Sequence, residues 1–166
     1  MKYRFALPLF LVAFLLQTTV FNHLKLFGTG PNLILCCLII LTFFYEGYSG
    51  GVLAVAFGLL QDVCFGVVVG PSALAYFGVF LLMRQLHDAF YRDSVLSIFC
   101  ATLIGTVSFV AIDWLVVAAF GGVYHIVYIL KMLPVLIGYH FVVLLLYYFL
   151  YGRRMIRRHP EDYIYR

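Results

Sequence analysis

The sequence has little charge and few long polar segments. Of its 166 residues, 11% are charged and 65% are hydrophobic, whereas soluble domains contain about 25% charged residues. A water-soluble domain of this size has too small an interior to cover so much apolar surface. The apolar residues also form long runs, without the alternation that marks the strands of a membrane barrel. Because hydrocarbon accepts only helices and closed barrels, the sequence predicts an all-α polytopic membrane protein.

The patterns of metal sites and catalytic groups are also missing from the sequence. No HExxH motif or paired acidic motif occurs, and Ser72 has no base beside it. The four cysteines lie inside apolar runs without the spacing of zinc ligands, at Cys36, Cys37, Cys64 and Cys100. We therefore expect no enzyme, no metal and no cofactor. Nucleic-acid binding is not expected either, because the net charge of +4 comes from residues that flank apolar segments.

Six apolar segments separated by short turns predict six transmembrane helices. They cover residues 5–21, 32–45, 51–68, 72–86, 95–120 and 126–151. Several are shorter than the roughly 20 residues that cross a bilayer, so we expect tilted helices and inexact bounds. The first segment follows a basic start but has no small-residue cleavage site, which favours a retained helix. The predicted organisation is a transmembrane domain at 1–152 and a basic cytoplasmic tail at 153–166.

The distribution of Lys and Arg predicts the orientation in the membrane. Cytoplasmic loops carry an excess of these residues. With an inside N-terminus and an even number of spans, nine of the eleven lie on the cytoplasmic side, and only Lys25 and Lys131 lie outside. We therefore expect both termini in the cytoplasm. Four arginines of the tail either anchor this orientation or contact anionic lipid headgroups: Arg153, Arg154, Arg157 and Arg158.

A few polar side chains interrupt the apolar runs, where a charge near the helix centre costs about 2.5 to 3.5 kcal/mol on insertion scales. Asp62, Asp113 and Lys131 are expected to form an intramembrane polar cluster in the outer half of the bundle, whereas Gln61 is noted only as polar. Asp113 and Lys131 have similar depths on antiparallel segments. They either form an ion pair, or Lys131 extends to the interface while Asp113 stays partly hydrated. His140 is expected to be a hydrogen-bonded packing residue.

Small residues recur at every fourth position of the third segment and the turn after it. These positions are Gly50, Ala54, Gly58, Asp62, Gly66 and Gly70. Such spacing lets another helix approach closely. Because each step of four residues turns about 40°, a straight helix cannot present all six to one neighbour. We expect 50–62 to form a seam for helix packing and partner binding, and Gly66, Gly70 and Pro71 to end the helix in a tight reversal.

Two segments, GPNLILCC at 30–37 and GYSGGVLAVAFGLLQDVCFGVVVGPSAL at 47–74, resemble the rod shape-determining protein MreD family. The matching positions are Pro31, Gly47, Gly51, Gly58, Leu59, Leu60, Asp62, Gly66, Gly70, Ala73 and Leu74. The resemblance covers residues 30–74 more closely and the whole architecture loosely. It implies a noncatalytic, multi-pass scaffold of the bacterial plasma (inner) membrane, within the elongation (rod) complex that supports lateral peptidoglycan synthesis and cell shape.

The resemblance also implies partners. They are MreC and, through that assembly, the MreB filament, RodA and its penicillin-binding transpeptidase, besides membrane lipids. Gly58, Asp62, Gly66 and Gly70 would be the signature positions. Because the outer loops are small, recognition is expected on helix faces. Asp62→Leu or Gly58→Leu is then expected to weaken association with MreC without abolishing membrane insertion.

An alternative function is transport. Six short helices of this total length also resemble the substrate-binding S component of energy-coupling factor vitamin transporters, so the expected bundle is S-component-like. In this alternative Asp62, Asp113 and Lys131 line a vitamin-sized pocket. The first segment lacks the Ala-xxx-Ala seam with which that family docks its coupling subunit, and this favours the scaffold.

Overall fold

The computed structural model describes residues 3–21, 29–44, 48–66, 68–86, 95–122 and 126–149. Within these ranges the chain forms six helices and no strand, so the prediction of an all-α fold is confirmed. The helices are α1 (Tyr3–Thr19), α2 (Leu33–Phe44), α3 (Ser49–Phe65), α4 (Pro71–Leu86), α5 (Val95–Ala119) and α6 (Ile126–Tyr147). Each corresponds to one predicted segment, with bounds that differ by a few residues. The tail with Arg153, Arg154, Arg157 and Arg158 lies outside the described residues.

Two of these helices have the length and composition to cross a membrane. Val95–Ala119 and Val127–Tyr147 have 25 and 21 residues, with mean hydropathies of 2.3 and 2.1. The apolar stretches of the first three helices, Ala6–Thr19, Leu33–Thr42 and Ser49–Phe65, are shorter. By length and composition, therefore, α5 and α6 are each able to cross a membrane.

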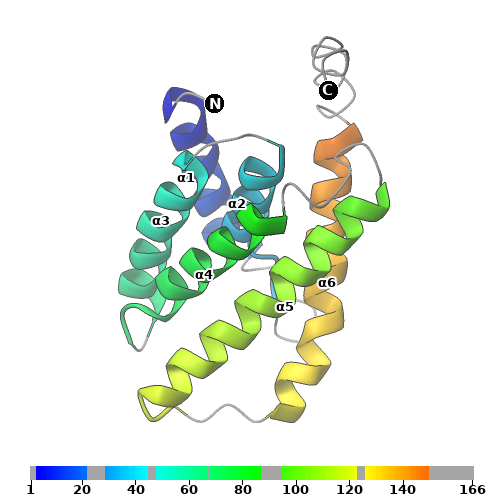
Figure 1. Ribbon diagram of the computed structural model, residues 1–166. Coiled ribbons are helices and arrows are strands. Elements are labelled where there is room, and N and C mark those ends of the chain that lie inside the picture. Colours follow the sequence, from blue (N-terminus) through cyan, green and yellow to red (C-terminus); the bar gives the residue numbers. More distant parts are fainter. Residues whose placement is uncertain are drawn as a thin grey trace.

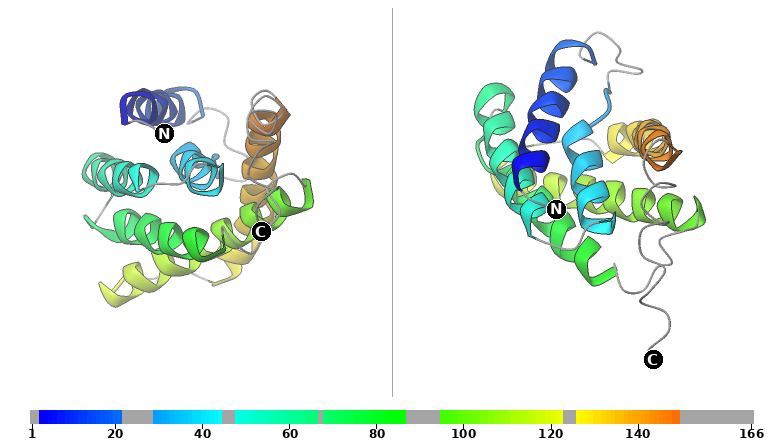
Figure 2. Two further views of the ribbon diagram at one scale, coloured as in Figure 1. Left: turned by 45° about the horizontal axis from the view of Figure 1, so that its top comes forward. Right: turned by 90° about the horizontal axis from the view of Figure 1, so that it is seen from above.

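Helix α2 lies at the centre of the bundle. It contacts every other described helix, and Figure 2 shows it enclosed by α1, α3, α4 and α6. Its side chains from Leu33 to Thr42 are buried, as are Pro31 and Asn32 just before it. At 12 residues it is about 18 Å long, against about 30 Å for a bilayer core. Helix α2 therefore begins inside the protein.

In chain order the described helices, α2 included, run alternately down and up (Figure 1). Helices α3 and α4 form an antiparallel pair, and α5 crosses obliquely between α4 and α6. The start of α1 and the end of α6 lie at the same end of the molecule (Figure 1). This arrangement places the connections on two opposite ends of the bundle.

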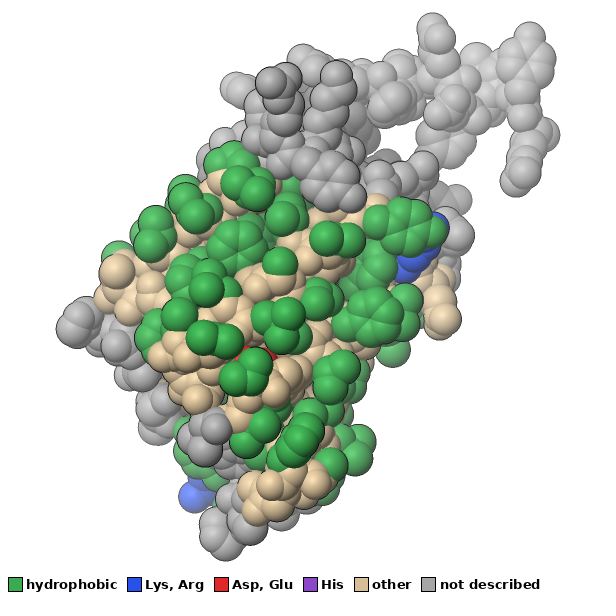
Figure 3. Space-filling model, turned by 90° about the vertical axis from the view of Figure 1, so that its left-hand side faces the viewer, with side chains coloured by type: hydrophobic (Ala, Val, Ile, Leu, Met, Phe, Trp, Pro, Cys, Tyr) green, Lys and Arg blue, Asp and Glu red, His purple; other side chains and the backbone are tan. Residues whose placement is uncertain are grey.

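Large apolar side chains cover the outward faces of the helices around α2. Val63 of α3 is 66% exposed, Leu115 of α5 is 62% exposed and Leu130 of α6 is 65% exposed. Figure 3 shows hydrophobic side chains across the described part of one face, with Lys and Arg only near its edges. Soluble monomers rarely expose apolar patches of more than a few hundred Å². This outer surface is suited to lipid or to apolar partners.

Candidate functional site

The buried start of α2 requires acceptors for its backbone. The first N–H groups of a helix have no partner within it. The Asn32 N–H donates to Nε2 of His140 on α6 at 3.0 Å. The Leu35 N–H donates to Oδ1 of Asn32 at 3.0 Å, so Asn32 acts as the N-cap residue. These bonds satisfy the first and the last of the four N–H groups at 32–35.

Gln17 of α1 satisfies the two N–H groups between them. Its Oε1 accepts from the Leu33 N–H at 2.8 Å and from the Ile34 N–H at 3.3 Å. In an apolar interior an unpaired N–H costs several kcal/mol. The start of α2 is therefore held by side chains that come from both sides of it.

The same acceptors connect α2 to α3 and α4. Nε2 of Gln17 donates to Oε1 of Gln61 at 3.2 Å. The Tyr76 hydroxyl donates to Oδ1 of Asn32 at 2.8 Å and lies 3.2 Å from Oε1 of Gln61. Tyr76 is fully buried, so these bonds satisfy a hydroxyl that has no access to water.

His140 extends the bonding to α5. Its Nε2 accepts the Asn32 N–H, so the ring proton of this neutral imidazole lies on Nδ1 and donates to Oγ1 of Thr106 at 2.9 Å. Both His140 and Thr106 are fully buried. Both ring nitrogens are thus used in packing, as the sequence predicted for His140. We call the set of side chains around the start of α2 the cap network: Gln17, Asn32, Gln61, Tyr76, Thr106 and His140.

Asp62 has the corresponding role at the start of α4. Its Oδ2 accepts from the Gly70 N–H at 2.9 Å and from the Ser72 N–H at 3.0 Å. Pro71 between them has no N–H. The carboxylate is buried, with 5% of the residue exposed, and it faces the positive end of the α4 dipole. Asp62 therefore fixes the reversal from α3 to α4.

The small residues of α3 pack against the chain's own helices. A Cβ on Gly50 would lie 2.9 Å from Cβ of Leu41 on α2. A Cβ on Gly58 would lie 2.6 Å from the Tyr76 ring and 3.0 Å from the Ala73 backbone of α4. Ala54 is fully buried. The predicted seam is thus an internal packing surface, and a separate protein would need another helix face.

Gly66 and Gly70 lie at the end of α3 and in the reversal, as predicted. The Gly66 N–H donates to the carbonyl oxygen of Asp62 at 2.8 Å, which closes the helix. Gly70 has a φ of 123°, a conformation that L side chains rarely adopt. Both glycines therefore serve the turn and not the seam.

No hydrogen bond or ion pair joins Asp62, Asp113 and Lys131 in the part of the chain that the structure describes. Asp113 on α5 is half-buried and Lys131 on α6 is exposed. The predicted ion pair between Asp113 and Lys131 is therefore not formed. The exposure of Lys131 favours the alternative in which it extends towards the interface.

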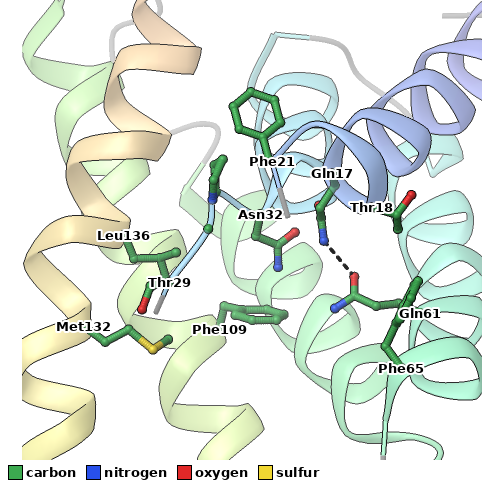
Figure 4. Close-up of a pocket in the computed structure, with 12 residues that line it drawn as sticks. Gln17, Thr18, Phe21, Thr29, Asn32, Gln61, Phe65, Phe109, Met132 and Leu136 are labelled. Carbon is green, nitrogen blue, oxygen red and sulfur yellow. Dashed lines mark hydrogen bonds between the residues drawn. The ribbon is translucent and has the colours of Figure 1, made fainter. Parts of the chain in front are cut away.

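A cavity of about 340 Å³ adjoins the cap network (Figure 4). Its polar wall comes from α1, α3 and the segment before α2, and its apolar wall comes mainly from α5 and α6. The lining residues are Gln17, Thr18, Phe21, Thr29, Gly30, Pro31, Asn32, Gln61, Phe65, Phe109, Met132 and Leu136. All of these side chains are uncharged. Asp62, Asp113 and Lys131, which the transport alternative places around a pocket, are not among them.

Sequence reasoning found part of the cap network and missed the rest. Gln61 and His140 are conspicuous because they interrupt apolar runs, but Gln17, Tyr76 and Thr106 were overlooked. Gln17 gives the same signal as Gln61 and could have been found with it. Asn32 after Pro31 has the composition of a helix N-cap.

Comparison of the chain with known protein families, with curated proteins and with solved structures found no match.

Proposed function

We propose that this chain is a six-span protein of the bacterial inner membrane and a noncatalytic scaffold of the elongation complex that binds MreC. Through MreC it would support MreB, RodA and the associated transpeptidase in lateral peptidoglycan synthesis. The observation that carries this proposal is that large apolar side chains cover the outer surface, while the buried polar side chains serve the packing of the chain's own helices. The resemblance of residues 30–74 to the MreD family supplies the partners.

The arrangement of the helices supports six spans with both termini in the cytoplasm. If every helix crosses the membrane, their alternating directions and the common end of α1 and α6 give an even number of crossings (Figure 1). The short α2 and α4 fit this topology because their buried N–H groups find acceptors inside the protein. Arg84 lies over the Tyr48 ring, 3.9 Å from its centroid, at the end of the α3–α4 pair that would face the cytoplasm.

Helix α6 is the best candidate for binding a partner helix. Only 17% of the most apolar 18-residue stretch of α6 is buried inside the chain, compared with 44% for that of α5. A Cβ on Gly138 of α6 would meet no atom within 4 Å, so the chain's own packing does not require a small residue there. Small residues on an outward face allow another helix to approach closely. We therefore assign MreC contact to the face of α6 around Gly138.

Co-purification with MreC in mild detergent tests the proposal. The wild-type chain is expected to retain MreC, and Gly138→Leu is expected to reduce the retained amount severalfold without loss of thermal stability. Val127→Leu, at a position 57% exposed on the same helix, is the matched control and should retain MreC fully. Absence of MreC from the wild-type preparation would contradict the scaffold.

The buried seam gives a different result in the same assay. Gly58→Leu would collide with Tyr76 and with the Ala73 backbone, and Asp62→Leu would leave two N–H groups without an acceptor. Both are therefore expected to lower stability together with MreC binding. Thermal stability measured beside co-purification separates such an indirect loss from the direct loss at Gly138.

The transport alternative has one observation in its favour, the cavity of about 340 Å³. Its size lies at the lower end of small-molecule pockets. The uncharged lining differs from the charged pocket that the alternative predicts. Recovery of ABC-type ATPases in place of cell-wall proteins in the same pull-down would favour transport.

A further inference from the structure

The polar wall of the cavity contains donors that the protein leaves unused. The chain of hydrogen bonds fixes the orientation of each amide. Because Oε1 of Gln17 accepts two backbone N–H groups, its Nε2 must be the donor to Gln61. Gln61 therefore presents Oε1 to Gln17 and turns Nε2 the other way, towards the cavity (Figure 4).

The Asn32 amide is oriented by the same reasoning. Its Oδ1 accepts from the Leu35 N–H and from the Tyr76 hydroxyl, so the other atom is Nδ2, a donor. Among the residues that the structure describes, neither Nδ2 of Asn32 nor Nε2 of Gln61 has an acceptor. The Tyr76 hydroxyl lies near both amides, 2.8 Å from Oδ1 of Asn32 and 3.2 Å from Oε1 of Gln61, and Figure 4 shows both side chains at the cavity.

Thr29 adds an unsatisfied hydroxyl to the same lining. The residue is 6% exposed, and its Oγ1 is buried without a hydrogen-bond partner among the described residues. Buried polar groups in native proteins usually have a partner, which can be a bound molecule. Two amide donors and one hydroxyl in the lining of this cavity therefore have no acceptor among the described residues.

The other walls of the cavity are apolar. They come from Phe21, Phe65, Phe109, Met132 and Leu136. Water would satisfy the donors of the polar wall, but it would leave the aromatic and aliphatic side chains that line the rest of the space of about 340 Å³ in contact with water. Covering these side chains with an apolar group is favourable. An occupant that matches both walls therefore has oxygen acceptors at one end and an apolar body.

We propose that this cavity binds an uncharged amphipathic group whose carbonyl or hydroxyl oxygens accept hydrogen bonds from Asn32, Gln61 and Thr29. Its apolar part lies against Phe109, Met132 and Leu136. Two sources supply this chemistry: the ester region and upper acyl chain of a membrane lipid, and a vitamin-sized uncharged solute. The site differs from the MreC face around Gly138: its polar wall lies on α1, α3 and the segment before α2, and Leu136, which α6 contributes to it, is 4% exposed, whereas Gly138 is exposed.

Native mass spectrometry of the full-length, delipidated protein tests the proposal. One arm titrates dioleoylphosphatidylethanolamine, and the other titrates riboflavin and pyridoxine. Met132→Trp fills the cavity from α6 and is expected to weaken binding by about tenfold or more, which corresponds to about 1.4 kcal/mol. Val127→Trp, outside the cavity on the same helix, is the control and should bind as the wild type does.

Thr29→Val gives a second, gentler test. Because the Thr29 hydroxyl has no partner among the residues that the structure describes, its removal should leave thermal stability unchanged or slightly higher. Thr29→Val should nevertheless lower the affinity for the bound probe about fivefold, which is the contribution of one hydrogen bond.

The source is a lipid if the lipid titration shows the losses expected for Met132→Trp and Thr29→Val, and a small solute if the riboflavin or pyridoxine titration shows them. If neither probe class binds, or if Met132→Trp binds as the wild type does, the site is overturned. Co-purification of MreC with Met132→Trp is measured on the same preparations. Retention of MreC with loss of the probe would separate the cavity from the scaffold function.

Discussion

The first N–H groups of α2 and of α4 are both satisfied by side chains from earlier or later parts of the chain, but in different ways. Helix α4 uses one carboxylate, Asp62, only 8 and 10 residues before the groups that it accepts. Helix α2 uses neutral acceptors, with Gln17 16 residues away and His140 108 residues away. A local charged cap secures one reversal of the chain. A distant neutral cap secures the packing of the whole bundle.

The largest loss of stability is expected from substitution of Asp62, since this one side chain accepts both N–H groups at the start of α4. Asp62→Leu leaves the Gly70 and Ser72 N–H groups without an acceptor and should lower the free energy of unfolding by about 2 to 5 kcal/mol. Unfolding by sodium dodecyl sulfate, followed by circular dichroism, measures it. Asp62→Asn keeps one oxygen acceptor and should lose less than half as much. Equal stability of the Leu variant and the wild type would contradict the cap.

A smaller effect is expected at Gln17, because the α2 start has several acceptors. Gln17→Met keeps the length of the side chain and removes the acceptor of the Leu33 and Ile34 N–H groups, which should cost about 1 to 3 kcal/mol. Thr18→Val is the matched control, since within the described part of the chain the Thr18 hydroxyl bonds only to carbonyl oxygens of its own helix. If Thr18→Val lowers the free energy of unfolding as much as Gln17→Met does, the loss in Gln17→Met does not come from the hydrogen bonds at the start of α2.

The smallest effect is expected at Tyr76. Its hydroxyl adds a donor to acceptors that already have other partners, Asn32 with the Leu35 N–H and Gln61 with Gln17. Tyr76→Phe should therefore cost only about 0.5 to 1.5 kcal/mol. Tyr128→Phe, at an exposed position on α6, should have no effect. A loss at Tyr76 larger than at Gln17 would mean that α4, and not α1, organises the network.

The helices and the local reversal could be predicted from the sequence. Long apolar runs end at glycine, proline or charge, and the bounds of α5 differ from the prediction by one residue at the C-terminal end. Asp62 was found because a carboxylate in an apolar run requires a partner, and Gly66, Gly70 and Pro71 lie directly after it. The information for this cap is contained in one short segment.

The cap network could not be predicted in the same way. Thr106 and Tyr76 are ordinary residues of apolar helices, and a Thr hydroxyl can bond to its own helix, as Thr102 does with the Ile98 carbonyl. Their importance depends on the position of α2, whose start becomes an internal group only when the other helices surround it. The small residues of α3 gave the correct packing spacing, but spacing alone does not tell whether the neighbouring helix belongs to the same chain.

The proposed six-span topology requires that the short helices, α3 and α4 among them, cross the membrane. Labelling of single cysteines in a cysteine-free background with a membrane-impermeant maleimide, in intact and in permeabilised cells, measures on which side each helix end lies. Val69→Cys between α3 and α4 and Phe120→Cys after α5, at positions 56% and 63% exposed, are expected to be labelled in intact cells. Tyr48→Cys and Gln85→Cys, at the opposite end, should be labelled only after permeabilisation. Labelling of Val69→Cys and Tyr48→Cys from the same side would show that α3 does not cross the membrane and would contradict the six-span scaffold.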